Sequence, residues 1–220
     1  MIINESVRTL SNEVLQKYAA VDPATIGHTR HFGFSCAEYK TSIPGAKAIG
    51  RAVTLRIPSM DSTLCHKAPE FIGKGDILVI DRAGEMNYAC LGGMVAYAMK
   101  LTGVEAVILD GAATDIQEIR EMGLLVFYRR LSAITTRVLG NDGELNTTVN
   151  CGGAVVNPGD IIVADENGFV ALPPEEAEGI LRAALERQAT EPEKQAMMRS
   201  GKKLADISRA NELIKAKLGQ

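Results

Sequence analysis

The chain has 220 residues and a formal net charge of −3, with five Tyr, five Phe and no Trp. A charge this close to neutral, without a cationic stripe or interleaved aromatic residues, disfavours direct binding to nucleic acid. No apolar run is long enough to cross a bilayer, and the amino terminus lacks the pattern of a signal peptide, so we expect a cytoplasmic protein that does not bind membranes.

The first two thirds of the chain alternate between strand and helix patterns. In chain order, the apolar spacing predicts a helix over 4–21, strands over 50–56 and 75–81, a helix over 92–101, a strand over 106–109, a helix over 116–122 and a strand over 124–128. Such alternation predicts a partly parallel α/β core.

The last third changes character. Residues 159–165 repeat an earlier strand pattern, Gly-Asp, four apolar residues and Asp, and residues 166–168 predict a hairpin turn after it. A long helix is expected to begin at Pro173-Pro174, because proline suits the first helical turn. We therefore expect one α/β domain over 1–190 and a helical tail over 191–220, which packs on the domain or on a neighbouring subunit.

The cysteines and histidines show no metal-ligand spacing. The four cysteines form no CxxC pair and the three histidines form no HExxH pattern, so neither a zinc site nor a redox pair is indicated. The turn around Cys151 resembles a nucleophile turn only superficially, because no partner base can be identified, and we interpret Cys151 as structural. A lone surface or packed histidine is the default interpretation for His28, His31 and His66.

Two glycines open the predicted helix over 92–101. Gly92 and Gly93 are followed by Met94 and Val95, and glycines at a helix start let a ligand approach unpaired backbone N–H groups. The Walker spacing with its lysine is absent, so a carboxylate suits this site better than a nucleotide phosphate. A tight loop whose glycines only permit the turn is the alternative.

Two carboxylates follow the predicted strand over 106–109. Asp110 comes directly after it and Asp115 five residues later, at the edge of the sheet where ligands of α/β proteins collect. Carboxylates there suit Mg²⁺, which takes one or two of them and keeps several waters. By spacing alone, however, Asp115 with Glu118 three residues later is better explained as a helix cap.

Taken together, these segments resemble one family, that of the 4-hydroxy-4-methyl-2-oxoglutarate aldolases and the related regulators of ribonuclease E activity A. The resemblance extends from about Thr25 to Asp206 and rests on Gly75-Asp76, Leu91-Gly92-Gly93, Asp110-Gly111 leading to Asp115, and Asn157-Pro158-Gly159-Asp160. It implies a swivelling β/β/α-type single domain of the α/β class, with mixed sheets and C-terminal helices. It also implies homotrimers or dimers of trimers with sites between subunits.

The resemblance further implies a metal-dependent class II aldolase or decarboxylase, a lyase that releases pyruvate from 4-hydroxy-2-oxo diacids or oxaloacetate. The amides from Gly92 to Val95 would hold the pyruvyl carboxylate. Asp115 would hold Mg²⁺ or Mn²⁺, directly or through water, and the metal would stabilise the enolate. Asp110, Thr114 and Asp115 are the catalytic candidates, and Thr114 also belongs to the expected substrate-binding set.

Thr114 departs from the family pattern Asp-Gly-x-x-Arg-Asp, in which the arginine contacts the substrate. Threonine carries no charge and cannot make a bidentate contact with a carboxylate. Either another cation such as Arg82 or Arg137 compensates, or the substrate differs, or the aldolase activity is weak or absent. The alternative function is therefore a non-catalytic regulator of ribonuclease activity or a diverged small-acid-binding protein.

Overall fold

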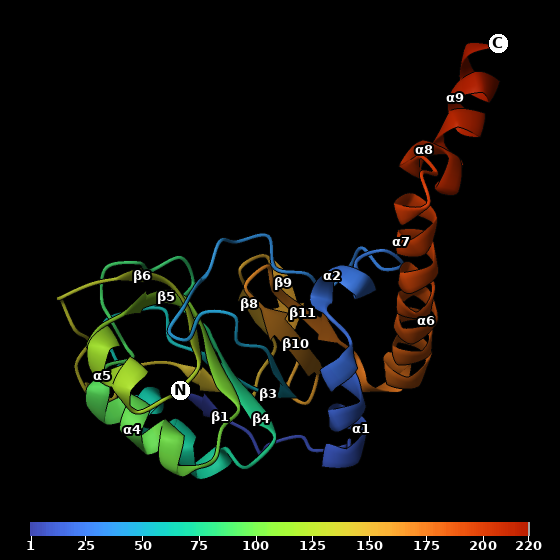
Figure 1. Ribbon diagram of the computed structural model, residues 1–220. Helices are drawn as coiled ribbons and strands as arrows, with labels where there is room; N and C mark the ends of the chain where they lie inside the picture. The colour runs from blue at the N-terminus through green and yellow to red at the C-terminus, as the bar shows by residue number, and fades with distance from the viewer. Residues whose placement is uncertain (220) are drawn as a thin grey trace.

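Four parallel strands form the centre of a mixed sheet in the computed structural model, which describes residues 1–219 (Figure 1). They lie side by side in chain order as β3 (Ala48–Arg56), β4 (Asp76–Asp81), β5 (Ala106–Ala113) and β6 (Val126–Leu131). The connections contain α3 (Thr63–Lys67) with η2 (Ala68–Phe71), α4 (Gly93–Leu101) and α5 (Ile116–Glu121). Because the strands are parallel, their carboxyl ends meet at one edge of the sheet, where α/β proteins bind ligands.

Shorter strands extend the sheet beyond β6 on one side and beyond β3 on the other. On the β6 side, β2 (Lys40–Thr41) pairs antiparallel to β6. On the β3 side, β7 (Glu144–Leu145) pairs antiparallel to the end of β3 and parallel to β1 (Ile2–Ile3), and β10 (Ile161–Asp165) pairs antiparallel to both the start of β3 and β11 (Gly168–Leu172). A separate hairpin is formed by β8 (Val149–Cys151) and β9 (Ala154–Val156). β3 thus joins the parallel strands to the antiparallel β10–β11 ribbon.

The central strands are buried on both faces. Along β4, Leu78 and Ile80 pack in the cluster that contains residues of α3, α4 and α5, whereas Ile77 and Val79 pack in the cluster that contains residues of β8 and β9. This double burial explains why the strand is a continuous apolar run rather than an alternating one. The α/β single domain with a mixed sheet and C-terminal helices is therefore the fold that the sequence predicted.

A third cluster ties the β10–β11 ribbon to helices from both ends of the chain. It contains residues of α1 (Asn12–Lys17), η1 (Tyr18–Ala20), α2 (Pro23–Ile26) and α6 (Ala177–Ala189), and the turn η3 (Pro174–Glu176) precedes α6. In α6 the buried side chains are Ala177, Leu181 and Ala184, all in the first two thirds of the helix. Beyond them the chain leaves the domain.

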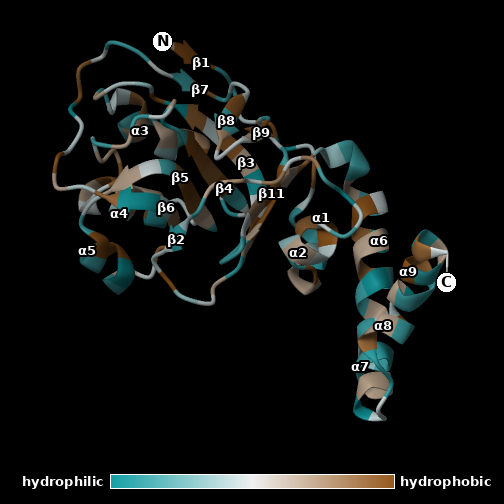
Figure 2. Cartoon of the chain, turned by 90° about the horizontal axis from the view of Figure 1, so that it is seen from above, coloured by the Kyte–Doolittle hydropathy of each residue, from teal (hydrophilic) through white to brown (hydrophobic). Residues whose placement is uncertain are grey.

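The C-terminal arm consists of the end of α6 together with α7 (Glu191–Arg199), α8 (Leu204–Ile207) and α9 (Ala210–Leu218). Figure 1 shows the arm extending away from the domain, and Figure 2 shows apolar and polar residues mixed along it. None of the described residues of α7, α8 or α9 is buried. Residues 191–219 contain no buried residue, and the packing of the tail over 191–220 on the domain or on a neighbouring subunit stays a prediction.

Two of the predicted elements differ most from the structure in their boundaries. The leading helix is shorter than 4–21, because Arg8 bonds the Asp76 carboxylate and the Phe71 carbonyl oxygen and thereby holds the preceding segment outside the helix. The strand predicted over 106–109 continues to Ala113, through a register shift between Leu109 and Ala112.

No helix among residues 1–219 is long and apolar enough to span a membrane.

Candidate functional site

A groove lies beyond the carboxyl end of β5, with a volume of about 200 Å³. It is lined by Ser62, His66, Ala89, Cys90, Gly92, Gly93, Met94, Val95, Thr114, Asp115, Thr135 and Thr136. Six of the seven residues that the sequence analysis proposed as site residues line this groove. It therefore joins the glycine helix start to the second carboxylate, at the edge where ligands are expected.

The floor of the groove is the start of α4. The Gly93 amide donates a hydrogen bond to Asp115 Oδ2 at 2.9 Å, whereas no acceptor among residues 1–219 meets the amides of Met94 and Val95. A Cβ on Gly92 would lie 2.8 Å from Asp115 Oδ2 and 2.9 Å from Thr114 Cγ2. A side chain at position 92 would therefore displace the Asp115 carboxylate, and two unpaired amides at a helix start are a geometry that suits an anion.

Asp115 has an unusual backbone conformation that directs its side chain toward α4. Its φ of 51° is left-handed, which costs a non-glycine residue on the order of 1 kcal/mol. It occupies the N-cap position of α5, yet its side chain makes no capping hydrogen bond there. The helix-cap explanation that spacing favoured was therefore wrong, because the carboxylate reaches the start of α4 instead of its own helix.

Glu118 brings a second carboxylate to the same helix start. A Cβ on Gly93 would overlap the carboxylate of Glu118, and both Asp115 and Glu118 are exposed. Glu118 was predicted only as a capping partner. Its three-residue spacing from Asp115 was the signal that both side chains lie on the same side of the chain, toward the start of α4.

The donor set fits a divalent cation that keeps most of its water. Two exposed carboxylates suit Mg²⁺ or Mn²⁺, which use one or two protein carboxylates and complete their shell with waters. Residues 1–219 contain no cluster of three or more His, Cys, Asp or Glu side chains that could enclose a metal. Asp115 is the carboxylate that would hold such an ion, with Glu118 beside it.

Asp110 lies outside the groove. Because β5 continues to Ala113, Asp110 is inside the strand rather than beyond it, and its side chain does not line the groove. Its carboxylate accepts hydrogen bonds from Arg129 Nη1 at 2.7 Å and from the Gly152 amide at 2.8 Å. The expectation that Asp110 and Asp115 lie together was wrong, and Asp110 instead links β5 to β6 and to the β8–β9 turn.

Thr114 lies beside Asp115 without adding charge. Its Oγ1 donates a hydrogen bond to Asp115 Oδ1 at 3.3 Å, and its backbone amide donates to the Leu91 carbonyl oxygen. The threonine therefore helps to orient the carboxylate, but supplies no cation to a substrate.

Neither of the two arginines suggested as substitutes lines the groove. Arg82 is fully buried, and its guanidinium donates to the carbonyl oxygens of Ile57 and Ser59 and to the Glu85 carboxylate. Arg137 is exposed on a segment that pairs with Asp61, but it is not among the lining residues. The groove thus has no guanidinium in the place that Thr114 leaves.

Asp61 fixes the loop that follows the groove wall. Its buried carboxylate accepts hydrogen bonds from Thr63 and from the amides of Leu139, Asn141 and Asp142. Burial alone would raise the pKa of Asp61, but these hydrogen bonds outweigh it and hold the pKa well below its usual range. The charged form therefore stabilises the fold around the groove.

Buried thiols lie next to the groove and on the other face of the sheet. Cys65 and Cys90 are both buried, and the neighbouring Cys90 together with burial raises the pKa of the Cys65 thiol. Burial likewise raises the pKa of the Cys151 thiol, which contacts Tyr39. A raised pKa disfavours the thiolate that a nucleophile needs, which supports the structural interpretation of Cys151.

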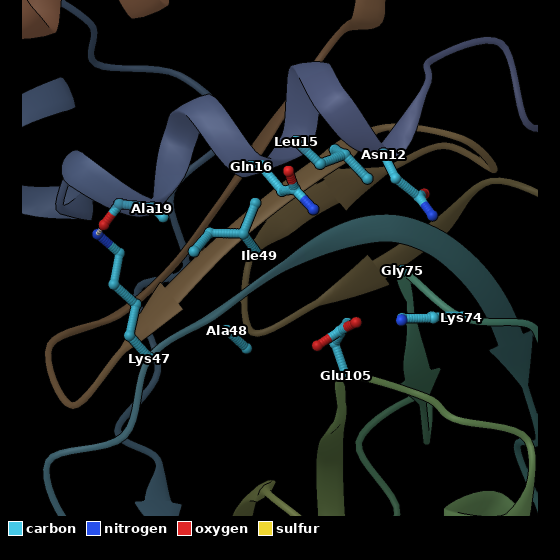
Figure 3. A pocket seen from close by; sticks show the side chains of 10 residues that line it. All are labelled: Asn12, Leu15, Gln16, Ala19, Lys47, Ala48, Ile49, Lys74, Gly75 and Glu105. Carbon is cyan, nitrogen blue, oxygen red and sulfur yellow. Dashed lines mark hydrogen bonds between the residues drawn. The ribbon is translucent and has the colours of Figure 1, made fainter.

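A larger hollow of about 300 Å³ lies at the opposite edge of the sheet, between α1 and the amino ends of β3, β4 and β5 (Figure 3). Lys47, at its rim, is already bound to the carbonyl oxygens of Ala19 and Val21 and to Asp22. Lys74 and Glu105 bring opposite charges to the same hollow. Because parallel sheets bind ligands at their carboxyl ends, the smaller groove is the better candidate.

Comparisons with known proteins show which family the chain is similar to. The RraA-like family, described as Aldolase/RraA, matches residues 24–171, close to the predicted start and short of the predicted end at Asp206. A 4-hydroxy-4-methyl-2-oxoglutarate aldolase of Thermus thermophilus is 34% identical over 132 residues, 58% of this chain and 77% of that protein.

Two solved structures share the fold. RraAS2 of Streptomyces coelicolor, described as an unusual member of the RNase ES inhibitor RraA family, has a TM-score of 0.76 at 24% identity and covers 86% of this chain and 98% of its own. The RNA-processing inhibitor RraA from Thermus thermophilus has a TM-score of 0.58 at 26% identity, covering 76% and 94%. The chain belongs to the RraA-like, Aldolase/RraA family.

Proposed function

We propose that the protein is a divalent-metal-dependent lyase that cleaves or decarboxylates a small 2-oxo acid and releases pyruvate. The observation that carries the proposal is the Asp115 carboxylate, held in a left-handed conformation at the open amino end of α4. Relatives named as aldolases support lyase chemistry at the level of the family. A groove of about 200 Å³ suits a small acid rather than a larger ligand.

Five residues of the groove each have a role in this proposal. The free amides of Met94 and Val95, at the positive end of the α4 dipole, bind the carboxylate of the 2-oxo acid. Asp115, oriented by the Gly93 amide and by Thr114, holds Mg²⁺ or Mn²⁺ directly or through water. When bound, the cation supplies Lewis acidity toward the 2-oxo group.

The proposal is tested by Mg²⁺- or Mn²⁺-dependent pyruvate release from oxaloacetate and from a 4-hydroxy-2-oxo diacid. Asp115→Ala should lower the rate at least about a hundredfold, because it removes the only lining carboxylate. Glu121→Ala is the matched control, since Glu121 is exposed on the same helix and does not line the groove. Activity and metal binding that survive Asp115→Ala would contradict the proposal.

A non-catalytic regulator or diverged small-acid-binding protein is the second candidate. Thr114 favours it, because the groove lacks the cation that the family pattern places there, and two solved relatives are described as RraA inhibitors. Thr114→Arg separates the two functions. A gain of pyruvate release identifies a lyase with a weakened site, whereas no release by either form and no metal binding identifies the regulator.

We also propose that the chain works as a homotrimer or a dimer of trimers, in which the C-terminal arm packs on a neighbouring subunit. Leu204, Leu213, Ile214 and Leu218 of the arm are between 54% and 65% exposed, which is costly for apolar side chains in water. Light scattering of Leu213→Glu with Ile214→Glu should show a smaller assembly than Lys215→Glu, the neighbouring control. Equal masses would exclude the arm from assembly.

A further inference from the structure

Among the described residues that line the groove, His66 alone has a side chain that carries nitrogen. The other polar lining side chains are the Asp115 carboxylate, the Cys90 thiol and the hydroxyls of serine and threonine. An imidazole can donate an N–H to an oxyanion at a fixed angle, which a rotating hydroxyl does less well. His66 is thus the described side chain of this groove that can offer an N–H donor to a substrate.

The position of His66 leaves its imidazole free for a ligand. It lies on α3, is exposed, and makes no side-chain hydrogen bond or ion pair with residues 1–219. Its backbone amide donates to the Ser62 carbonyl oxygen, so the helix does not depend on the imidazole. A side chain with no structural partner at the rim of a binding groove is available to contact a bound molecule.

Neither Thr114 nor the two arginines suggested as substitutes supplies this contact. Arg82 is committed to buried carbonyl oxygens and to Glu85, and Arg137 does not line the groove. Thr114 contributes a hydroxyl that already donates to Asp115. A 2-oxo acid whose carboxylate lies on the Met94 and Val95 amides therefore meets one nitrogen donor among the described side chains that line the groove, the imidazole of His66.

We propose that His66 is a substrate-contacting residue that donates a hydrogen bond to the 2-oxo oxygen of the bound acid, in the functional place of the arginine that Thr114 replaces. The inference rests on the proposed function for the identity of the ligand. The test measures ligand binding as well as substrate turnover, because a residue that donates to the 2-oxo oxygen also binds an unreactive analogue of the substrate.

The experiment measures binding of oxalate, an unreactive analogue of a 2-oxo acid, by calorimetry in the presence of Mg²⁺, together with pyruvate release from oxaloacetate. His66→Leu should weaken oxalate binding at least about tenfold and lower kcat by about a hundredfold, the usual effect of removing one oxyanion donor. His66→Gln keeps an N–H donor and should fall between wild type and His66→Leu. His31→Leu, also exposed but outside the groove, is the control and should match wild type.

The outcomes separate this inference from the proposed function. Oxalate binding that depends on His66, without pyruvate release from any 2-oxo acid, supports the inference and contradicts the lyase. Pyruvate release and oxalate binding that His66→Leu leaves unchanged overturn the inference and leave the lyase standing, and a wild-type protein that binds no oxalate overturns the inference too. Thr114→Arg added to His66→Leu should restore at least part of both readouts. Thermal unfolding should be the same for all folded variants, since the imidazole has no structural partner.

Discussion

Replacing Asp115 by Ala, Gly and Asn separates its backbone strain, its hydrogen bond and its charge. The wild-type residue is held at φ 51° and accepts the Gly93 amide hydrogen bond at 2.9 Å. Ala removes the hydrogen bond and keeps the strain. Gly removes both, and Asn keeps an acceptor while tolerating the left-handed conformation and losing the charge.

The expected free energies of unfolding follow from these terms. A net hydrogen bond contributes about 1 kcal/mol, and the charge at the helix start about 0.5 kcal/mol more at an exposed position. Asp115→Ala should therefore cost about 1.5 kcal/mol. In Asp115→Gly, relief of about 1 kcal/mol of strain offsets most of that loss, so we expect a cost near about 0.5 kcal/mol. Asp115→Asn should cost about 0.5 kcal/mol, the contribution of the charge alone.

Urea unfolding at fixed pH and salt measures these differences, and Mn²⁺ binding measured on the same samples reports the proposed ligand role. All three variants should lose most of the metal affinity, although Asp115→Gly stays nearly as stable as wild type. A Gly variant that is as unstable as the Ala variant would refute the strain argument. An Asn variant that binds Mn²⁺ like wild type would refute the ligand role.

Three further outcomes follow from the structure. Gly92→Ala should displace the Asp115 carboxylate, because the new Cβ would lie 2.8 Å from Oδ2, and should lower metal affinity about tenfold with little change in the urea midpoint. Arg82→Met should cost about 3–5 kcal/mol in unfolding free energy, because it leaves buried carbonyl oxygens and Glu85 unpaired; a loss below about 1 kcal/mol would contradict this. Asp61 has a folded pKa below its unfolded value of about 3.9, so its charged form stabilises the fold above that pH and the stabilisation is lost as pH falls. The stability gap between wild type and Asp61→Asn should therefore be constant above about pH 5 and shrink below about pH 4, and a gap that grows with acid would contradict the assigned direction.

The sequence alone determined the central α/β core, because its signals are local. The buried run of β4 and the glycine after α4 are short-range patterns, and the structure places β4 at Asp76–Asp81 and Gly103 at φ +77°. The turn at 166–168 also formed as predicted, between Asp165 and its cross-strand partner Gly168. Each of these features depends on backbone propensity and on hydrophobic spacing, which neighbouring residues encode.

Only the tertiary structure decided which groups share the groove. Spacing favoured a cap for Asp115 and placed Asp110 beside it, but a register shift in β5 turned Asp110 toward Arg129, and a left-handed backbone turned Asp115 toward Gly93. His66 gave no signal of its own, because its place in the same groove as Asp115 depends on how α3, α4 and α5 pack on the sheet. The contacts of Asp110 with Arg129 and of Asp115 with Gly93 join residues 19 and 22 positions apart, and such contacts are set by packing rather than by local spacing.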